Sequence, residues 1–432
     1  MALGIDRMDF PGIHSETAAP GVEELKHLGV TAKRIERPAS EQEARDLLSR
    51  AYKEKLSILP CGGGTSLGSG MLPESVDVAL DMIGMNKVLA FDPRNLNLAV
   101  LSGMTLTQIN EYLAGQGKGF FLPLDPQLPH RATLGGVYAS NASGPSRLRY
   151  GTVRDQVLGV RGADGLGREV GFGGKTVKNV SGYDLTKFFI GSAGSLGLIT
   201  SLSFRVYPLP ESSSLCDFVF ETLEGLEKFL AALRSSVLIP SAVIVKELAA
   251  GPDVSNSVGS RFRAWASFEG HSRAVDRQNK DILKLAGEFG ARGNVKVGRE
   301  EMVQGLRSVV NPDGPNQDSI FKVSVPISQG PRAYVSIGKL VRAKGLHSKV
   351  ILFPGNGLIY IYFQGEGQEK IAPLIQDLKD ISQAGGGYAS PVRAHRNILA
   401  SWGPRVEPAL HQFLLQPIKE QLDPAGVFPP IV

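Results

Sequence analysis

Residues 60–70 read Pro-Cys-Gly-Gly-Gly-Thr-Ser-Leu-Gly-Ser-Gly, and they follow a short apolar segment, residues 57–60, that we predict to be a strand. Consecutive glycines allow the backbone to adopt positive φ and to turn several N–H groups toward one point. Such a nest binds a phosphate or pyrophosphate, and the hydroxyls of Thr65 and Ser66 add donors. A tight turn without a ligand is the alternative explanation of the same glycines.

Two common phosphate-binding classes do not fit this stretch. A Walker loop is excluded because no Lys-Ser or Lys-Thr pair closes it. A Rossmann fingerprint is excluded because the glycine spacing differs and no helix followed by an acidic residue about 20 positions on is present. We therefore predict a nucleotide site of another class.

Two further stretches are rich in small residues: residues 133–144, TLGGVYASNASG, which follow Leu124-Asp125-Pro126, and residues 182–200. Small side chains leave backbone exposed, and a flat ring or a sugar–phosphate can lie against such a strip. Close packing of a helix on a strand would also require small residues. Three such stretches between residues 60 and 200 favour a ligand site over packing alone.

The remaining pattern predicts an α+β protein. A poorly patterned arm, residues 1–38, contains one short helix at 22–28, and Ser40 with Glu43 has the spacing of a capping box for a helix at 40–54. Thr105 with Gln108 predicts a second capping box. Further helices are expected at 184–190, 223–235, 276–289, 332–343, 369–384 and 407–422. Strands are expected at 76–82, 87–91, 96–101, 198–206, 217–220, 242–248, 262–268, 321–325, 350–353 and 359–364.

Pro208, Pro210 and the serine run 212–214 mark the main domain boundary. Beyond it, strands and helices alternate in a way typical of antiparallel strands covered on one side by helices. The last helix is expected to return to the first domain. The predicted domains are 1–38, 39–211, 212–395 and 396–432.

Composition excludes several function classes. The 432 residues include two cysteines and seven histidines, so a disulfide framework, a cysteine zinc site and an iron–sulfur cluster held by this chain alone are not expected, and no metal site is predicted. The net charge of +5 comes without a basic run interleaved with aromatics, so nucleic acid is not an expected partner. No signal peptide or apolar span appears, which predicts a cytoplasmic protein or one held at the inner face of the membrane by partners.

The order of these motifs resembles the FAD-binding domain of the vanillyl-alcohol-oxidase superfamily, called PCMH-type. Within it, residues 149–155 and the run GGKTVKNVSGYDL at 173–185 are most similar to the FAD-binding E-type subunit of bacterial glycolate oxidase. Residues 421–429 resemble the closing motif of the family. The resemblance implies a two-lobed FAD-binding domain, then an α+β sandwich cap domain of ferredoxin-like type, and a C-terminal helix that packs back on the FAD domain.

The resemblance also implies the cofactor residues. Residues 62–66 would hold the FAD pyrophosphate, and Ile199 would meet the cofactor through its backbone. Because some relatives attach FAD to a histidine beside the loop, where this chain has Cys61, non-covalent FAD is implied. The full set of expected cofactor-binding residues is Cys61, Gly62, Gly63, Gly64, Thr65, Ser66, Gly70, Pro126, Thr133, Leu134, Gly135, Ala139, Asn141, Ser143, Gly144, Tyr150, Gly151, Gly194 and Ile199.

The sequence departs from catalytic relatives, which carry metal-binding histidines in stretches resembling HAGDGN and GEHG. The matching positions here, residues 353–360 and 385–388, contain no histidine. Oxidation of a 2-hydroxy acid needs a base for the hydroxyl proton and a cation for the carboxylate. His395, Arg393 and Lys322 are the candidates, although a helix-start or hydrogen-bonded loop histidine and a strand-end surface lysine explain two of them better.

Four functions follow. The first is an FAD-binding subunit of a glycolate or D-lactate dehydrogenase complex, with a catalytic flavoprotein and an iron–sulfur subunit as partners. The second is a self-sufficient FAD-dependent oxidoreductase acting on a 2-hydroxy acid. The third is an assembly subunit with a structural FAD. A nucleotide-sugar reductase with the same FAD fold is the fourth, and the run at 173–185 weakens it.

Overall fold

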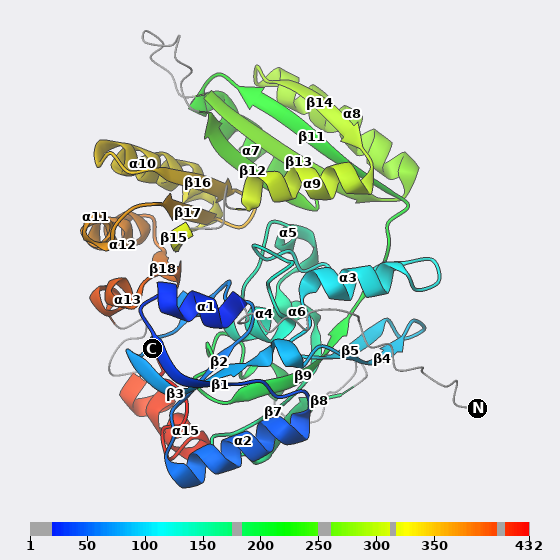
Figure 1. Cartoon of the computed structure of the whole chain (residues 1–432). Helices are drawn as coiled ribbons and strands as arrows, with labels where there is room; N and C mark the ends of the chain where they lie inside the picture. The colour runs from blue at the N-terminus through cyan, green and yellow to red at the C-terminus, as the bar shows by residue number, and fades with distance from the viewer. Residues whose placement is uncertain (1–19, 175–183, 249–260, 312–316, 404–410, 432) are drawn as a thin grey trace. The chain divides into compact units, whose positions relative to one another are not determined.

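The computed structural model describes residues 20–174, 184–248, 261–311, 317–403 and 411–431. These residues form two compact units, each with both helices and β-sheet (Figure 1). The first unit consists of the described parts of Met1–Ser143, Thr152–Pro208 and Ala394–Val432, and the second of those of Gly144–Gly151 and Leu209–Arg393. Part of the glycolate-oxidase-like run, residues 175–183, lies outside the described residues.

The first unit begins with a parallel sheet in the order β1-β3-β2. Its elements are α1 (Pro20–His27), β1 (Thr31–Glu36), α2 (Glu41–Glu54), β2 (Ile58–Cys61) and β3 (Ser75–Asp81). The capping of α2 is confirmed, because the Glu43 N–H donates to the Ser40 hydroxyl. The sequence pattern missed β1. This edge strand has no buried residue, so it carries no apolar alternation.

A five-stranded antiparallel sheet in the order β4-β5-β9-β7-β8 completes the core of this unit. Its strands are β4 (Val88–Asp92), β5 (Asn97–Leu101), β7 (Val157–Ala163), β8 (Glu169–Gly173) and β9 (Leu198–Arg205), and β6 (Phe120–Phe121) pairs with β10 (Tyr207–Pro208). The helices are α3 (Leu106–Ala114), α4 (Leu134–Ser140) and α6 (Val153–Gln156), with short 3-10 turns at Leu67–Ser69, Met82–Gly84 and Leu185–Lys187. The capping box predicted for Thr105 and Gln108 is confirmed.

The helix predicted at 184–190 is wrong. Only the 3-10 turn Leu185–Lys187 forms there. The carbonyl oxygen of Thr186 accepts a hydrogen bond from the buried Tyr138 hydroxyl, so a tertiary contact uses a group that a helix would bond internally. The chain then leaves through Gly191, whose φ is +83°.

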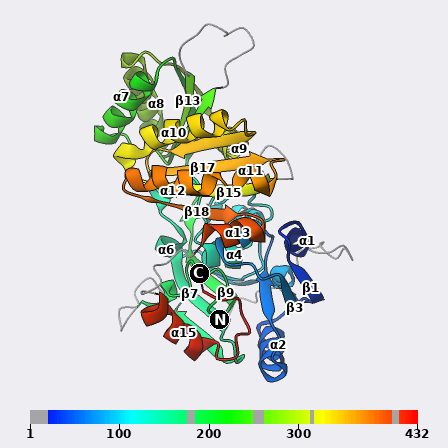
Figure 2. The same ribbon diagram turned by 90° about the vertical axis from the view of Figure 1, so that its left-hand side faces the viewer.

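The C-terminal elements of the first unit are α13 (Arg396–Trp402), a π-helical turn (His411–Leu415) and α15 (Gln416–Leu422). Figure 2 shows α15 beside the sheet that contains β7 and β9. Val427 and Phe428 join a core cluster with α2 and β3. The chain end therefore packs in the same unit as the glycine-rich loop.

The second unit is built on one eight-stranded antiparallel sheet in the order β14-β11-β13-β12-β16-β17-β15-β18. The strands are β11 (Ser212–Phe220), β12 (Ala242–Leu248), β13 (Arg261–Gly270), β14 (Arg292–Val297), β15 (Gln317–Ser324), β16 (Ser348–Phe353), β17 (Leu358–Gln364) and β18 (Tyr388–Arg393). In the described ranges, β12 and β16 are joined through the pair Val245 and Leu352. The sheet thus consists of two four-stranded halves.

Each half has the chain order strand–helix–strand–strand–helix–strand, the split βαβ pattern called ferredoxin-like. The helices of the unit are α5 (Arg147–Tyr150), α7 (Leu223–Ser235), α8 (Ser272–Glu288), α9 (Arg299–Val310), α10 (Gly330–Ala343), α11 (Gln368–Ile371) and α12 (Leu374–Ala384), with a 3-10 turn at Ile327–Gln329. Figure 2 shows α10 and α12 side by side along the second half. The helix predicted at 369–384 is interrupted at Pro373, which lacks the N–H that a continuous helix needs.

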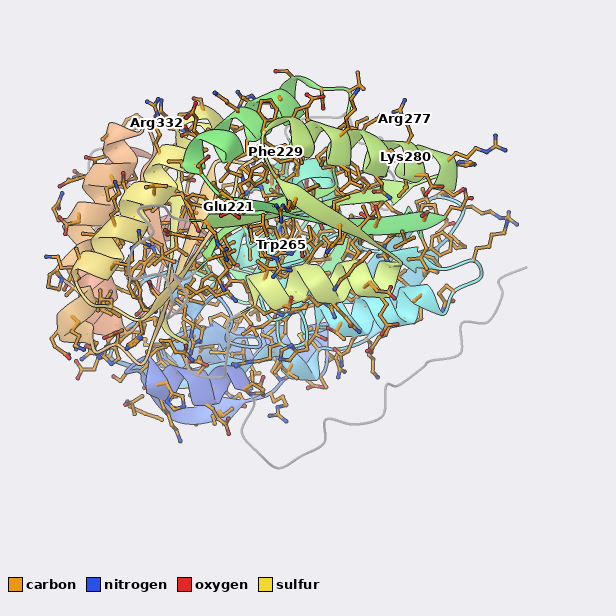
Figure 3. All side chains as sticks on the ribbon, turned by 90° about the horizontal axis from the view of Figure 1, so that it is seen from above. Glu221, Phe229, Trp265, Arg277, Lys280 and Arg332 are labelled. Carbon is orange, nitrogen blue, oxygen red and sulfur yellow. The ribbon has the colours of Figure 1, made fainter. Side chains whose placement is uncertain are left out.

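Both faces of the first half are covered. Phe229 of α7 packs with Phe218 and Phe220 of β11 at ring-centroid distances of 5.6 and 5.0 Å. On the other face, α9 shares a buried cluster with Trp265 of β13. Figure 3 shows Phe229 on the α7 side of the sheet and Trp265 on the α9 side. Within the described ranges, no helix of either unit is long and apolar enough to cross a bilayer.

Candidate functional site

The glycine loop leaves β2 and is held by close contacts with the segment before α4. A Cβ atom on Gly62 would lie 2.1 Å from the Thr133 hydroxyl oxygen, and one on Gly63 would lie 1.7 Å from the carbonyl oxygen of Arg131. The Arg131 Nε atom donates to the Gly63 carbonyl oxygen at 3.1 Å. These two glycines are required because no side chain fits.

Positive φ is needed at only one of the three consecutive glycines. Gly64 has φ +78°, a conformation that residues with a side chain rarely adopt. We expected positive φ along the run, Gly63 included, and that expectation is wrong. Gly63 is fixed by its approach to Arg131 and not by its backbone conformation.

The loop presents unused donors. The backbone N–H groups of residues 63–66 donate to no acceptor in the described part of the chain, and neither do the Thr65 and Ser66 hydroxyls. Gly63 and Gly64 are buried residues, and buried backbone N–H groups are almost always paired in native proteins. An anionic ligand with several oxygen acceptors, such as a pyrophosphate, fits this set of donors.

The loop forms one wall of a narrow cavity that has room for about 100 Å³ and opens to solvent. Other lining residues come from α4, from Ala193, Gly194 and Gly197, and from the start of β9. A Cβ on Gly135 would lie 2.8 Å from the Ser102 Cβ and 3.1 Å from the Ser102 carbonyl oxygen, so a side chain does not fit at this position of α4. Twelve of the predicted cofactor residues line this cavity: Cys61, Gly62, Gly63, Gly64, Thr65, Ser66, Gly70, Thr133, Gly135, Ala139, Gly194 and Ile199.

The other predicted cofactor residues are elsewhere. In the first unit, Pro126 and Ser143 are buried, Leu134 lies in the core cluster, and Asn141 ends α4 with φ +52°. Gly144, Tyr150 and Gly151 belong to the second unit, where the Tyr150 hydroxyl donates to the Glu269 carboxylate at 3.2 Å. Cofactor contacts of these seven residues stay predictions.

Sequence reasoning missed Ser102, which lines the cavity directly after β5. Its hydroxyl is buried and has no hydrogen-bond partner among the residues that the structure describes. A serine at the end of a strand is a weak signal by itself. An unpaired buried hydroxyl is costly, so a ligand that pairs with it gains affinity.

Replacing Ser102 with alanine should weaken FAD binding about five- to tenfold, the value of one hydrogen bond, while the stability of the apoprotein stays equal or rises. Flavin-fluorescence titration and thermal unfolding measure the two effects. Ser213 in the second unit has an equally unpaired buried hydroxyl and serves as the matched control. Ser213→Ala should leave FAD affinity unchanged, and equal losses in both variants would contradict a role for Ser102 in the cavity.

Cys61 cannot act as a thiolate in this site. Its side chain is fully buried and donates to the Leu59 carbonyl oxygen at 3.4 Å. Burial, and then the negative charge of Asp81, raise the pKa of the Cys61 thiol far above its usual range. Because the thiolate is the nucleophilic form, the cysteine beside the loop is unsuited to a covalent link with a cofactor.

The three candidate catalytic residues do not come together in one unit. His395 precedes α13 in the first unit, where its Nδ1 accepts a hydrogen bond from the Asn397 N–H at 3.2 Å. Burial and then the charge of Arg396 lower the pKa of His395, which favours the neutral capping form. A helix-capping role accounts for this histidine, and a catalytic role stays a prediction.

Lys322 and Arg393 belong to the second unit and share one face of the sheet. Lys322 is paired with Tyr360 on one side and with Ser390 on the other, and Arg393 is paired with Ile320, two residues from Lys322. Arg393 is buried, and Lys322 is half-buried. Among the described residues, no group of three histidine, cysteine, aspartate or glutamate side chains could hold a metal ion.

Residues 32–173 match the model of a family described as FAD binding domain. The glycolate oxidase subunit GlcD of Bacillus subtilis is 32% identical over 207 residues, 48% of this chain and 43% of that protein. A D-lactate dehydrogenase of Archaeoglobus fulgidus is 31% identical over 262 residues, 60% of this chain and 57% of that protein. A mitochondrial D-2-hydroxyglutarate dehydrogenase of Bos taurus is 32% identical over 220 residues, 51% of this chain and 40% of that protein.

The chain thus spans about half the length of the curated relatives it matches. The chain is also similar to a solved structure of an alkyldihydroxyacetonephosphate synthase, with a TM-score of 0.69 and 21% sequence identity. The matched region covers 92% of this chain and 76% of the synthase chain. At that identity the likeness concerns the fold alone.

Proposed function

Since this chain carries an FAD-binding domain of the vanillyl-alcohol-oxidase superfamily, we propose that it is the FAD-binding subunit of a glycolate or D-lactate dehydrogenase complex. The names of the similar proteins support 2-hydroxy acids as the substrate class. The order of motifs in residues 149–185 supports the E-type subunit. The complex would lie in the cytoplasm or at the inner face of the membrane through its partners.

The donors of the cavity fit FAD. The free N–H groups of residues 63–66 and the hydroxyls of Thr65 and Ser66 would hold its pyrophosphate. The small residues Gly135, Ala139 and Gly194 would border the sugar and ring, and Ser102 would supply a further hydrogen bond. Bound FAD supplies the capacity to accept two electrons as a hydride.

One observation supports an accessory role, in which this chain binds FAD and a partner subunit acts on the substrate. In the described part of the chain, the cavity is lined by no carboxylate, imidazole, ammonium or guanidinium group, and its one thiol is buried. A base for the hydroxyl proton and a cation for the substrate carboxylate are therefore missing from it. We propose that a catalytic flavoprotein partner provides them.

The electron acceptor would also come from a partner. The chain has two cysteines, Cys61 and Cys216, and both are buried and free. Burial raises the pKa of the Cys216 thiol, as it does that of Cys61, so neither presents the thiolate that cluster ligation requires. An iron–sulfur subunit is thus the third member of the proposed complex.

A self-sufficient 2-hydroxy acid oxidoreductase is the second candidate, because Lys322 and Arg393 share a sheet face with Tyr360 and could hold a carboxylate. Reconstitution of the complex from its subunits distinguishes an accessory subunit from a self-sufficient enzyme. A complex assembled without this chain should lose its glycolate or D-lactate dehydrogenase activity. Full activity in its absence would contradict the subunit role.

Non-covalent FAD is a separate prediction, based on the buried, protonated Cys61 beside the glycine loop. Acid precipitation of the purified protein should release yellow FAD to the supernatant, where absorbance and chromatography identify it. Flavin that remains with the precipitated protein would show a covalent bond. A protein that stays colourless after added FAD would show that the cavity binds something else.

A further inference from the structure

Lys419 in α15 is a buried lysine that does not line the cavity. Its side chain is 9% exposed, and its Nζ atom donates to the Asp423 carboxylate at 2.6 Å and to the Ser195 carbonyl oxygen at 2.6 Å. Two more carbonyl oxygens, of Phe428 and Pro429, lie at 3.1 and 3.0 Å. A buried ammonium is tolerated when it is paired and fully hydrogen-bonded. Lys419 thus joins the chain end to the segment around Ser195.

Asp423 organises the rest of this contact. Its carboxylate is fully buried and accepts hydrogen bonds from the N–H groups of Val427 and Phe428, at 2.8 and 2.9 Å. The Val427 carbonyl oxygen in turn accepts from the N–H of Ile58, the first residue of β2, at 2.7 Å. Since β2 leads directly into the glycine loop, the chain end is attached to one wall of the cavity through β2.

Ser195 does not line the cavity itself, but it directly follows two residues that do. The residues before it, Ala193 and Gly194, line the cavity and have φ of +51° and +78°. Left-handed backbone at an alanine costs free energy and persists only where surrounding contacts impose it. The Ala193 N–H donates to the Ala139 carbonyl oxygen at 2.8 Å. On the other side of the turn, the N–H and the hydroxyl of Ser195 donate to the Ser192 carbonyl oxygen, and Lys419 donates to the Ser195 carbonyl oxygen, which ties the turn to α15.

We propose that Lys419 is a positioning residue for the cofactor cavity: it fixes the Ala193–Ser195 turn relative to the glycine loop, so that FAD affinity depends on it. The proposal rests on FAD binding at this cavity. Lys419 acts on the ligand only through Ser195 and the chain end, and it touches none of the cavity surface.

Lys419→Met keeps the length of the side chain and removes its donors. We expect the dissociation constant of FAD to rise about 10–100-fold, the range found when outer partners that orient binding groups are removed from metal sites. Equilibrium flavin-fluorescence titration measures this. Lys370 in the second unit also pairs with a buried carboxylate at i,i+4, Glu366, at 3.1 Å, so Lys370→Met is the control and should leave FAD affinity unchanged.

Lys419→Met alone leaves the Asp423 charge buried and unpaired, which is strongly destabilising. The double variant Lys419→Met/Asp423→Asn removes that charge and keeps an oxygen acceptor for the Val427 N–H. Thermal stability should recover in part in the double variant, because the buried charge is gone although the Phe428 N–H loses its carboxylate acceptor. FAD affinity should stay weak because the bond to Ser195 is still missing. Recovery of both would reduce Lys419 to a stability role and overturn the proposal.

FAD binding by the wild-type protein distinguishes a failure of this proposal from a failure of the proposed function. If wild-type protein binds no FAD, the proposed function itself fails. If wild-type protein binds FAD and both Lys419 variants bind it equally tightly, only the positioning role fails.

Discussion

Gly63→Val should reduce FAD affinity by about two orders of magnitude or more, because misplacement of binding groups by about 1 Å has effects of that size. A Cβ at this position would lie 1.7 Å from the Arg131 carbonyl oxygen, so the loop has to move away from the segment before α4. The N–H groups of residues 63–66 would then no longer converge. Titration of the apoprotein with FAD measures the loss.

Gly171→Val is the matched control. The glycine lies in β8 of the same unit, and a Cβ there would meet the nearest atom, Cγ of Arg161, at 3.7 Å, an ordinary contact. This variant should bind FAD as the wild type does. The second unit should stay folded in Gly63→Val, as judged by its unfolding transition. Normal FAD affinity in Gly63→Val would mean that the pyrophosphate binds elsewhere.

Phe229→Ala should destabilise the second unit by about 3–5 kcal/mol, the usual effect of removing a buried phenyl ring. The ring is fully buried between Phe218 and Phe220, on the α7 side of the sheet in Figure 3. Loss of both contacts leaves a cavity that rigid strands cannot close. Urea unfolding followed by circular dichroism gives the free energy of unfolding.

Arg277→Ala is the control for that measurement. Arg277 lies on the outer surface of α8, 63% exposed, with its Nε 3.9 Å from the Asp281 carboxylate, and Figure 3 shows it pointing away from the sheet. Its removal should change the free energy of unfolding by less than about 1 kcal/mol. A comparably small effect for Phe229→Ala would contradict the packing of α7 on β11.

The sequence predicted a glycine loop after a short strand because the signal for it is local. Glycines and hydroxyls in residues 60–70 are typical of an anion nest, and binding of a pyrophosphate there stays a prediction. The requirement for glycine at position 63 could not be predicted in the same way, because the residue that it contacts, Arg131, lies 68 positions away in the sequence. Ser102 was missed for a similar reason, because only the fold shows that its hydroxyl faces the cavity without a partner.

Regular elements were predicted where burial follows the periodicity of the element. The helix predicted at 223–235 matches α7, and the strand at 242–248 matches β12. The edge strand β1 has no buried residue and gave no signal. The 3-10 turn at Leu185–Lys187 replaced a predicted helix because Tyr138, far away in the sequence, takes the Thr186 carbonyl oxygen.

Anaerobic reduction of the isolated chain separates an accessory FAD-binding subunit from a self-sufficient enzyme. The purified protein, loaded with FAD, is mixed with glycolate or with D-lactate, and the flavin absorbance is followed, with dithionite as the positive control. Because the cavity is lined by no base and no cation in the described part of the chain, the flavin should stay oxidised with both acids and bleach only with dithionite. Rapid bleaching by either acid would show that this chain holds a complete active site of its own.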